Sequence, residues 1–346
     1  MAKPAASRKR LATRGGVTVH DVARVAGVSP ITVSRALNTP QALAADTLER
    51  VKDAVARTGY VPNLLAGGLR SARSGMVAAV FPTVAGPVFA SLIQSLTDTL
   101  DEHGHQLMLG QSGYRHSRED ALLDAIIGRR PVGIVLTGMA HSAEGRRRLI
   151  ASRIPIVETW DLSPSPIDMA VGFDHERTGE AVCEFLHARG RRRMALVSGD
   201  DQRARRRAAG FTRAARKLGL LARGEEIPTH WVPAPASLAN SRGGLAALLG
   251  KMPDLDAVFC SSDLVALGVL TEAYARGLRV PERLAVVGFG DLEFADGVLP
   301  ALTTVRIDGA RMGRTAAEML IERAAGRTVA EPIVDVGFSL VQRASA

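Results

Sequence analysis

The stretch AGVSPITVSRALN, residues 26–38, carries the strongest structural signal in the chain. Ser29 is a typical helix N-cap, and Pro30 suits the first helical position, where its missing N–H costs no hydrogen bond. Gly27 favours a tight turn at the end of a preceding helix that Thr18 would cap. We therefore predict a helix, a tight turn and a second helix, an arrangement that presents the second helix to the major groove of DNA.

The second predicted helix has one apolar and one polar face. Val33, Ala36 and Leu37 follow helical spacing and are expected to face inward. The opposite face offers hydroxyl and guanidinium groups for phosphates and base edges, together with Ile31 for a thymine methyl group. The residues of this head that we predict to contact DNA are Thr18, Ser29, Pro30, Ile31, Thr32, Ser34, Arg35 and Asn38.

A third helix is predicted over residues 45–58. Its apolar positions Leu48, Val51 and Val55 would face inward, which leaves Arg50, Lys52 and Arg57 available for the DNA backbone.

Charge is concentrated in the same part of the chain. The 346 residues carry a net charge of +9, and residues 1–75 hold 12 Lys and Arg against 4 Asp and Glu. The rest of the chain is therefore close to neutral, with a net charge of +1. This distribution indicates a polyanion-binding head on a neutral body, although a basic head that only aids solubility has the same composition.

From Met76 onward, short apolar strands alternate with amphipathic helices, which predicts parallel sheets covered on both faces. The predicted strands fall into two sets, which indicates two similar lobes that bind a ligand at the carboxyl ends of their strands. The first set is 76–81, 106–109, 133–137 and 155–157, and the second is 194–198, 257–260 and 284–289.

The run TVHDVARVAGVSPITVSRALN at 18–38, followed by GYVPNLLAGGLRS at 59–71, resembles the head of the LacI family of bacterial transcription regulators. The resemblance implies a homodimer, possibly paired into a tetramer, on a near-palindromic operator. It also implies a hinge at Asn63–Leu69 that folds on operator DNA, with Leu69 opening a base step and Asn63 and Arg70 as further contacts.

The family resemblance continues through the body and implies the two-lobe fold of periplasmic sugar-binding proteins. It is carried by FCSSDLVALG at 259–268, GLRVPERLAVVGFGD at 277–291 and LTTVRID at 302–308. The expected fold is an all-α helix-turn-helix DNA-binding head plus an α/β two-lobe periplasmic-binding-protein-like effector domain. The expected boundaries are a basic tail at 1–16, the head at 17–62, a hinge and linker at 63–75 and an effector and dimerisation domain at 76–346, with lobe 1 at about 76–175 and 306–330 and lobe 2 at about 176–305 and 331–346.

A narrower resemblance, to gluconate-utilisation repressors, rests on MAVGFD at 169–174 and DVGFSL at 335–340. The effector-binding residues that the family implies are Phe89, Gln111, Thr137, Phe173, Arg207, Ser262 and Asp263. Arg207 matches an arginine that reaches the ligand in many members, and its planar cation suits a carboxylate. Three of the others, Phe89, Gln111 and Thr137, are equally explained as packing or turn residues, and Asp263 as a helix cap.

One departure from the family bears on the ligand. Most sugar-binding members have Asp-Asp after the strand that ends at Phe289, whereas this chain has Gly290-Asp291. A cleft that lacks this carboxylate but keeps Arg207 favours an anionic ligand such as a sugar acid, for example gluconate or a keto-gluconate. A neutral sugar or another metabolite is the alternative.

Other classes of protein fit the sequence less well. GFGDLE at 288–293 lacks the third glycine of a dinucleotide-binding fingerprint, and Gly250-Lys251 is not followed by the Ser or Thr of a phosphate-binding loop. The GxSxG motif of a serine nucleophile is also missing, so an enzyme is a distant alternative. A transport binding protein would need a signal peptide and no basic head. We expect a cytoplasmic protein without metal or cofactor, in which Cys183 and Cys260 are buried apolar residues.

Overall fold

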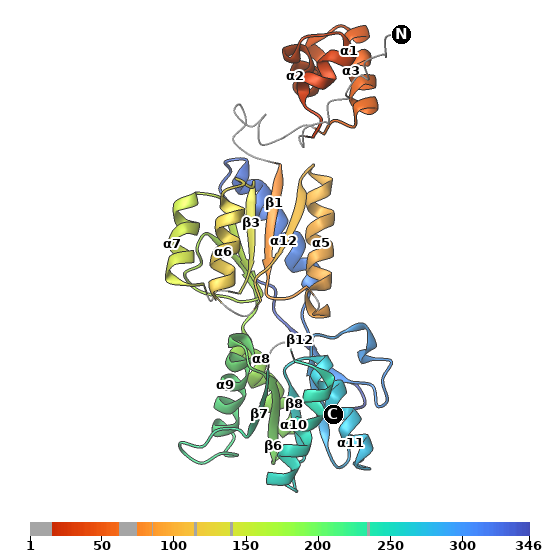
Figure 1. Ribbon diagram of the computed structural model, residues 1–346. Helices are drawn as coiled ribbons and strands as arrows, with labels where there is room; N and C mark the ends of the chain where they lie inside the picture. Colours follow the sequence, from red (N-terminus) through yellow and green to blue (C-terminus); the bar gives the residue numbers. More distant parts are fainter. Residues whose placement is uncertain (1–15, 62–74, 85, 114–115, 139–140, 234–235) are drawn as a thin grey trace, which may run out of the picture. The chain divides into compact units, whose positions relative to one another are not determined.

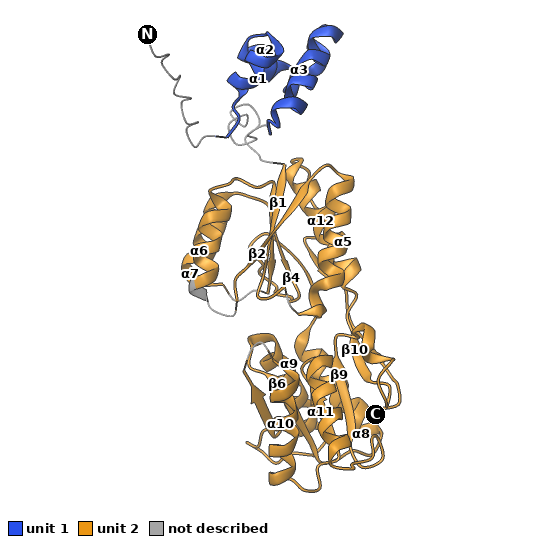
Figure 2. Cartoon of the chain, turned by 45° about the vertical axis from the view of Figure 1, so that its right-hand side comes forward, with its two compact units in different colours: residues 1–72 blue, residues 73–346 orange. Residues whose placement is uncertain are grey.

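The computed structural model describes residues 16–61, 75–84, 86–113, 116–138, 141–233 and 236–346. The chain forms two compact units, Met1–Ala72 and Arg73–Ala346 (Figure 2). The predicted DNA contacts Asn63, Leu69 and Arg70, with the rest of the expected hinge, lie outside the described residues.

The described part of the first unit, residues 16–61, forms three short helices around a small core (Figure 1). They are α1 (Val19–Ala26), α2 (Pro30–Asn38) and α3 (Ala45–Thr58), with a 3-10 turn, η1, at Pro40–Ala42. Gly27 has φ of +65°, so the turn between α1 and α2 needs the left-handed conformation that glycine adopts at little cost. The buried residues are Val22, Ala23, Ala26, Val33, Ala36, Val51 and Ala54.

Leu37 corrects one sequence expectation, since 37% of its surface is exposed, whereas Val33 is fully buried. The inner face of α2 is therefore narrower than predicted, because the short helices leave room for only two small or branched side chains of α2 in the core.

The second unit contains two six-stranded sheets. The sheet of lobe 1 has the strand order β11-β5-β4-β3-β1-β2. Its strands are β1 (Met76–Phe81), β2 (Gln106–Gln111), β3 (Gly133–Thr137), β4 (Ile156–Thr159), β5 (Met169–Gly172) and β11 (Ile333–Asp335), all parallel. Helices α5 (Ala90–Glu102) and α12 (Gly309–Ala324) cover one face, and α6 (His116–Ile127) and α7 (Ala143–Ser152) cover the other (Figure 1).

The sheet of lobe 2 has the order β12-β10-β9-β8-β6-β7, in which only β12 is antiparallel to its neighbour. Its strands are β6 (Met194–Gly199), β7 (Thr229–Val232), β8 (Ala257–Cys260), β9 (Ala285–Phe289), β10 (Thr303–Arg306) and β12 (Ser339–Val341). Helices α8 (His175–Ala188) and α9 (Gln202–Lys217) cover one face, and α10 (Leu238–Lys251) and α11 (Asp263–Ala275) the other. Cys183 and Cys260 are buried and free, as predicted.

The chain crosses between the lobes three times, and the last crossing lies later than expected. We predicted a return to lobe 2 at residue 331, but β11 pairs with β5 in the sheet of lobe 1. The crossing therefore falls between Asp335 and Ser339, where β12 joins the second sheet. Each of these two strands has only three residues, too few for a periodic pattern to identify.

Two glycines fix the crossing of α8 over α9. A Cβ atom on Gly179 would lie 1.9 Å from the carbonyl oxygen of Arg207, and one on Gly210 would lie 2.0 Å from that of Glu176. Only glycine permits backbones to approach so closely, so these residues hold the first turn of α8 against the middle of α9. In the described part of the chain, no helix is long and apolar enough to span a membrane.

Candidate DNA interface and effector cleft

The exposed face of α2 is organised by its own side chains. The Ser29 hydroxyl accepts a hydrogen bond from the N–H of Thr32 at 3.1 Å, which caps the helix, and the Asn38 amide donates to the carbonyl of Ser34 at 2.8 Å. Ile31 is 66% exposed, which is unusual for a large apolar side chain and fits a surface that a partner covers. Thr18 lies at the start of α1, where its N–H and hydroxyl donate to Asp21 at 3.0 and 2.7 Å.

The four acidic residues of the head neutralise four of its cations. Within residues 16–61 the ion pairs are Arg24–Asp21 at 2.8 Å, Arg50–Asp46 at 4.0 Å, Lys52–Glu49 at 2.9 Å and Arg57–Asp53 at 3.2 Å. The three cations of α3 that we expected to be available for DNA are therefore already paired.

Arg35, on α2, is the remaining cation of this part of the head. It is exposed, and its guanidinium has no ion-pair or hydrogen-bond partner among residues 16–61. The exposed face of α2 thus carries an unneutralised cation beside Ile31, a combination suited to a phosphate or guanine contact.

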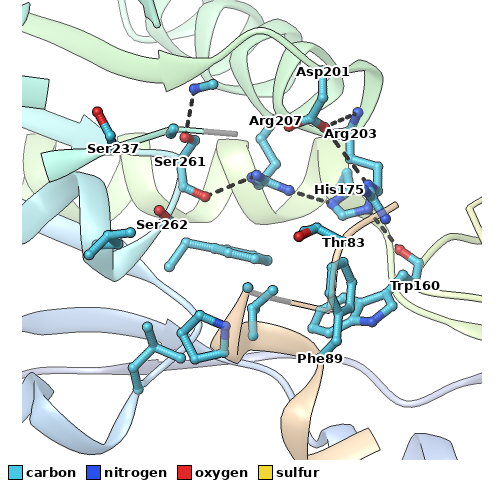
Figure 3. Close-up of a pocket in the computed structure, with 18 of the residues that line it drawn as sticks. Thr83, Phe89, Trp160, His175, Asp201, Arg203, Arg207, Ser237, Ser261 and Ser262 are labelled. Atoms are coloured by element: carbon cyan, nitrogen blue, oxygen red, sulfur yellow. Dashed lines mark hydrogen bonds and ion pairs between the residues drawn. The ribbon is translucent and has the colours of Figure 1, made fainter. Parts of the chain in front are cut away.

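A cavity of about 440 Å³ lies between the two lobes of the second unit (Figure 3). This volume falls in the usual range for a small-molecule site. Three of the predicted effector residues line this cavity: Phe89, Arg207 and Ser262. The other lining residues include Thr83, Val88, Trp160, His175, Asp201, Arg203, Ser237, Ser261 and Phe289.

Arg207 is the central cation of the cleft. It is 6% exposed and donates to the carbonyl of Ser261 at 3.1 Å and to Nδ1 of His175 at 3.0 Å, while its guanidinium lies 4.1 Å from the centre of the Phe289 ring. The pKa of Arg207 is lowered to about 10, chiefly by burial and also by neighbouring Arg203, although the charges of Asp201 and Asp161 act in the opposite direction. Among the described residues no carboxylate lies within ion-pair distance of Arg207, and its Nε–H has no hydrogen-bond partner.

Three helices of lobe 2 begin at this cleft. Their N-cap residues Asp201, Ser237 and Ser262 all line it, and each accepts hydrogen bonds from backbone N–H groups of the first turn. Helix N-termini carry a partial positive charge, which adds to the charges of Arg203 and Arg207. Among the described lining residues the only carboxylate is that of Asp201, which caps α9 and lies 3.8 Å from the guanidinium of Arg203.

The acid that follows Gly290 does not restore a carboxylate to the cleft. Asp291 lies outside the lining and forms ion pairs with Arg306 at 2.5 Å and Arg343 at 2.8 Å. Gly290 has φ of +127°, a conformation that side chains rarely adopt, so the glycine is required by the backbone at this position.

Four predicted effector residues do not line the cleft. Phe173 is fully buried behind it, where its ring packs against Trp160 and Phe289 at 5.6 and 6.0 Å. Asp263 is buried and accepts hydrogen bonds from Thr304 and from the N–H of Leu292, at 2.5 and 2.7 Å. Gln111 and Thr137 end two strands of lobe 1 without reaching the lining.

Asp263 is also not the cap of α11. Ser262 takes that role, because its hydroxyl accepts from the N–H of Val265 at 3.3 Å. The Asp263 carboxylate instead ties α11 to β10 and to the loop after β9.

The sequence interpretation missed Trp160, His175 and Arg203. Arg203 stands one helical turn before Arg207, so it occupies the same face of α9, and this spacing was a usable signal. Its guanidinium lies 5.5 Å from the ring of Phe89 in the other lobe. Trp160 and His175 carry no such signal, because their proximity depends on how the chain crosses between the lobes.

Family models match both parts of the chain. Residues 18–63 match bacterial regulatory proteins of the lacI family, and residues 183–346 match a periplasmic binding protein-like domain. A protein from Pseudomonas aeruginosa named HTH-type transcriptional regulator GntR is 39% identical over 338 residues, covering 97% of this chain and 98% of the relative. The chain belongs to the LacI family. The predicted fold class, a helix-turn-helix head with a periplasmic-binding-protein-like body, is confirmed.

Further regulators match most of the chain. The Escherichia coli K12 regulators GntR and IdnR are each 29% identical, over 93% and 94% of this chain and 96% and 97% of their own. A crystal structure of a LacI-family regulator from Silicibacter pomeroyi superimposes with a TM-score of 0.88 at 30% identity, covering 95% of this chain and 99% of that one. The GntR structure from Chromobacterium violaceum gives a TM-score of 0.74 at 33% identity, over 78% and 98% of the two chains.

These relationships establish the general function. The protein is a DNA-binding transcriptional regulator, and its relatives are regulators rather than enzymes.

Proposed function

We propose that this regulator is a homodimeric repressor whose effector is a sugar acid of the gluconate type, and that it acts in the cytoplasm, where the bacterial chromosome lies. Two heads would read two half-sites of a near-palindromic operator, because the two-fold symmetry of a dimer is mirrored in its site. Acid bound in the cleft would favour an arrangement of the lobes that weakens the DNA-competent state.

The observation that carries the choice of ligand is the environment of Arg207. Its charge is buried, and its two hydrogen-bond partners among the described residues, His175 Nδ1 and the carbonyl of Ser261, are neutral. An isolated buried charge is costly unless it is paired, so a ligand carboxylate is the missing counter-ion. Three helix N-termini and Arg203 favour the same sign of charge.

The hydroxyl groups of the lining suit the rest of a sugar acid. Hydroxyl-bearing residues line the cavity, and Phe289 adds an apolar surface; the hydroxyl-bearing residues are Thr83, Ser237, Ser261 and Ser262. Polar groups of this kind orient a polyol, while the apolar surface packs against its carbon chain. The motifs shared with gluconate-utilisation repressors, and relatives named GntR and IdnR, support gluconate or a close derivative.

The head supports sequence reading through α2. Arg35 is the unneutralised cation on its exposed face, and Ser29, Thr32, Ser34 and Asn38 supply polar groups around it. We assign the base or phosphate contacts to this face of α2 rather than to the paired cations of α3.

Calorimetric titration of the purified protein tests the effector directly. The ligands are gluconate, 2-ketogluconate, gluconate 6-phosphate and, as a neutral control of similar size, glucose. We expect one of the acids to bind and glucose not to bind. Binding of glucose without any acid would instead support a neutral-sugar regulator and would remove the role assigned to Arg207.

A further inference from the structure

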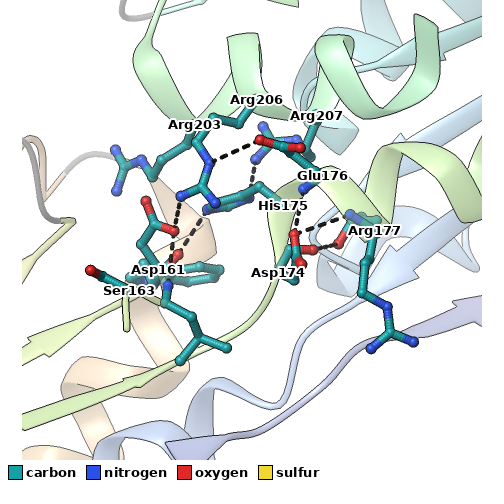
Figure 4. Close-up of polar contacts among 12 residues, drawn as sticks. Asp161, Ser163, Asp174, His175, Glu176, Arg177, Arg203, Arg206 and Arg207 are labelled. Carbon is teal, nitrogen blue, oxygen red and sulfur yellow. Dashed lines mark hydrogen bonds and ion pairs between the residues drawn. The ribbon is translucent and has the colours of Figure 1, made fainter. Parts of the chain in front are cut away.

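His175 joins the cation of the cleft, Arg207 (Figure 4), to the backbone of Trp160 in the opposite lobe (Figure 3). It is the first residue of α8, in lobe 2, and is 1% exposed. Its Nδ1 accepts from Arg207 at 3.0 Å, and its Nε2 lies 2.8 Å from the carbonyl oxygen of Trp160, which follows β4 in lobe 1. Because a guanidinium only donates, Nδ1 must be the acceptor, and the ring is neutral with its proton on Nε2, which donates to Trp160.

Trp160 has a backbone conformation that its surroundings must maintain. Its φ is +69°, in the left-handed region that a bulky residue rarely occupies. Its side chain packs edge-on against Phe89 and Phe173, with ring centres 5.1 and 5.6 Å away, and its indole N–H has no hydrogen-bond partner among the described residues. The hydrogen bond from His175 is a polar restraint on a residue whose backbone would relax if it were released.

The helix crossing keeps His175 in reach of Arg207. Gly179 and Gly210 bring α8 and α9 into backbone contact beside these residues, so no side chain separates the two helices at this point. A change in the position of the Arg207 guanidinium is therefore felt by the imidazole ring rather than absorbed by the helices.

We propose that His175 is a positioning residue that transmits occupation of Arg207 to Trp160, and so to lobe 1. This inference rests on the proposed function, since it needs an acid at Arg207. A ligand carboxylate competes for the guanidinium N–H groups and draws Nη1 away from His175. The ring then loses the partner that fixes its orientation, its bond to the Trp160 carbonyl is weakened, and Trp160 and the adjoining Phe89 shift against the cleft.

The chain offers a direct reporter of this link. Its two tryptophans are Trp160 and Trp231, so Trp231→Phe leaves Trp160 as the sole source of indole fluorescence. In that background, His175→Asn keeps an acceptor near Nδ1 but loses the donor to Trp160, whereas His175→Gln keeps an N–H at the Nε2 position. His187→Asn, on the same helix and outside the cleft lining, is the matched control.

Two readouts are taken for each variant, gluconate affinity by calorimetry and the emission and acrylamide quenching of Trp160 during the same titration. We expect gluconate to change the Trp160 signal of the Trp231→Phe protein. Because His175 lines the cleft, the Trp160 signals are compared at saturating gluconate, so that the comparison does not depend on affinity. With His175→Asn the change in the Trp160 signal should be lost. His175→Gln should restore most of the change, and His187→Asn should leave it intact.

The inference is overturned if gluconate still produces the full Trp160 change in the His175→Asn protein. A ligand-free comparison keeps the two proposals separate. Without ligand, His175→Asn should already shift the emission of Trp160 and increase its quenching, because the restraint on its carbonyl is gone. If no sugar acid binds the parent protein, the proposed effector is wrong, and His175 is judged on this ligand-free shift: a signal equal to that of His187→Asn removes the link.

Discussion

Replacing Arg207 by Met should leave the stability of the ligand-free protein nearly unchanged but weaken its affinity for acid. Methionine keeps an unbranched apolar chain over Phe289 but removes the charge and the two hydrogen bonds to His175 and Ser261. If the charge is present to bind a ligand, the protein without ligand gains nothing from it. If the charge is structural, its loss must destabilise the fold.

The balance is worked from the surroundings of Arg207. A pKa lowered from 12.5 to about 10, chiefly by burial, means that Arg207 stays charged at pH 7 but that its charge costs the fold about 3 kcal/mol relative to the unfolded chain. The two lost hydrogen bonds have a charged donor, so each is worth about 1.5 kcal/mol or more. These two contributions nearly cancel, so the free energy of unfolding of the ligand-free variant should be close to that of the wild type.

Acid binding should be weakened, because removing one partner of a buried ion pair costs about 2 kcal/mol or more, roughly thirtyfold in Kd. Urea unfolding without ligand and calorimetry with gluconate measure the two quantities. The control is Arg213→Met, on the same helix as Arg207, which removes exposed ion pairs with Glu176 and Glu180 of α8. It should lower the free energy of unfolding by less than about 1 kcal/mol and leave gluconate affinity unchanged. A ligand-free Arg207→Met protein destabilised by more than about 2 kcal/mol, or one that retains its affinity for acid, would refute the reasoning.

Three further predictions concern the head, the helix crossing and a buried histidine. Arg35→Ala should weaken specific DNA binding by about 1–3 kcal/mol without changing gluconate affinity. Arg57→Ala removes a cation that is already paired, so it should weaken DNA binding less. Fluorescence anisotropy with labelled DNA measures both affinities. Gly179→Ala should lower the free energy of unfolding by about 1–3 kcal/mol, because its Cβ atom would clash with the backbone of α9. Gly243→Ala, in an open part of α10, should raise the free energy of unfolding by up to about 1 kcal/mol. Equal effects of the two substitutions in urea unfolding would contradict the backbone contact. Burial alone would lower the pKa of His141, but Glu119 and Glu158 raise it to about 9, so the charged form stabilises the fold. This contribution to the free energy of unfolding, about 3 kcal/mol, should be fully present below pH 6.5 and lost as the pH rises through 9. The variant His141→Gln should remove this pH dependence.

The helical head and the strands of both sheets follow from local patterns. Helix α3 and strands β1, β3 and β8 have the predicted bounds, because continuous apolar runs and helical spacing are properties of a few neighbouring residues. The cap at Ser29 and the turn at Gly27 likewise depend only on the residues beside them.

The composition of the cleft depends on packing between distant segments. The family resemblance led to Arg207, Ser262 and Phe89, but Phe173 lies behind the lining, and Trp160 and His175 meet only because the chain crosses between lobes near Asp174. An aromatic residue next to a lobe crossing has the same local sequence pattern whether its ring faces the cavity or the core. Pairing of the head cations with acids on their own helices was, by contrast, readable from their spacing of three or four residues.

The central claim is that acid held at Arg207 weakens the binding of DNA by the head. The most direct measurement is the affinity of the full-length protein for the DNA upstream of its own gene, by fluorescence anisotropy, with and without saturating gluconate. We predict that gluconate weakens binding by about 5–150-fold, and that Arg207→Met binds the same DNA but does not respond. DNA affinity that is unchanged or increased by gluconate, in a protein that calorimetry shows to bind it, would contradict the account.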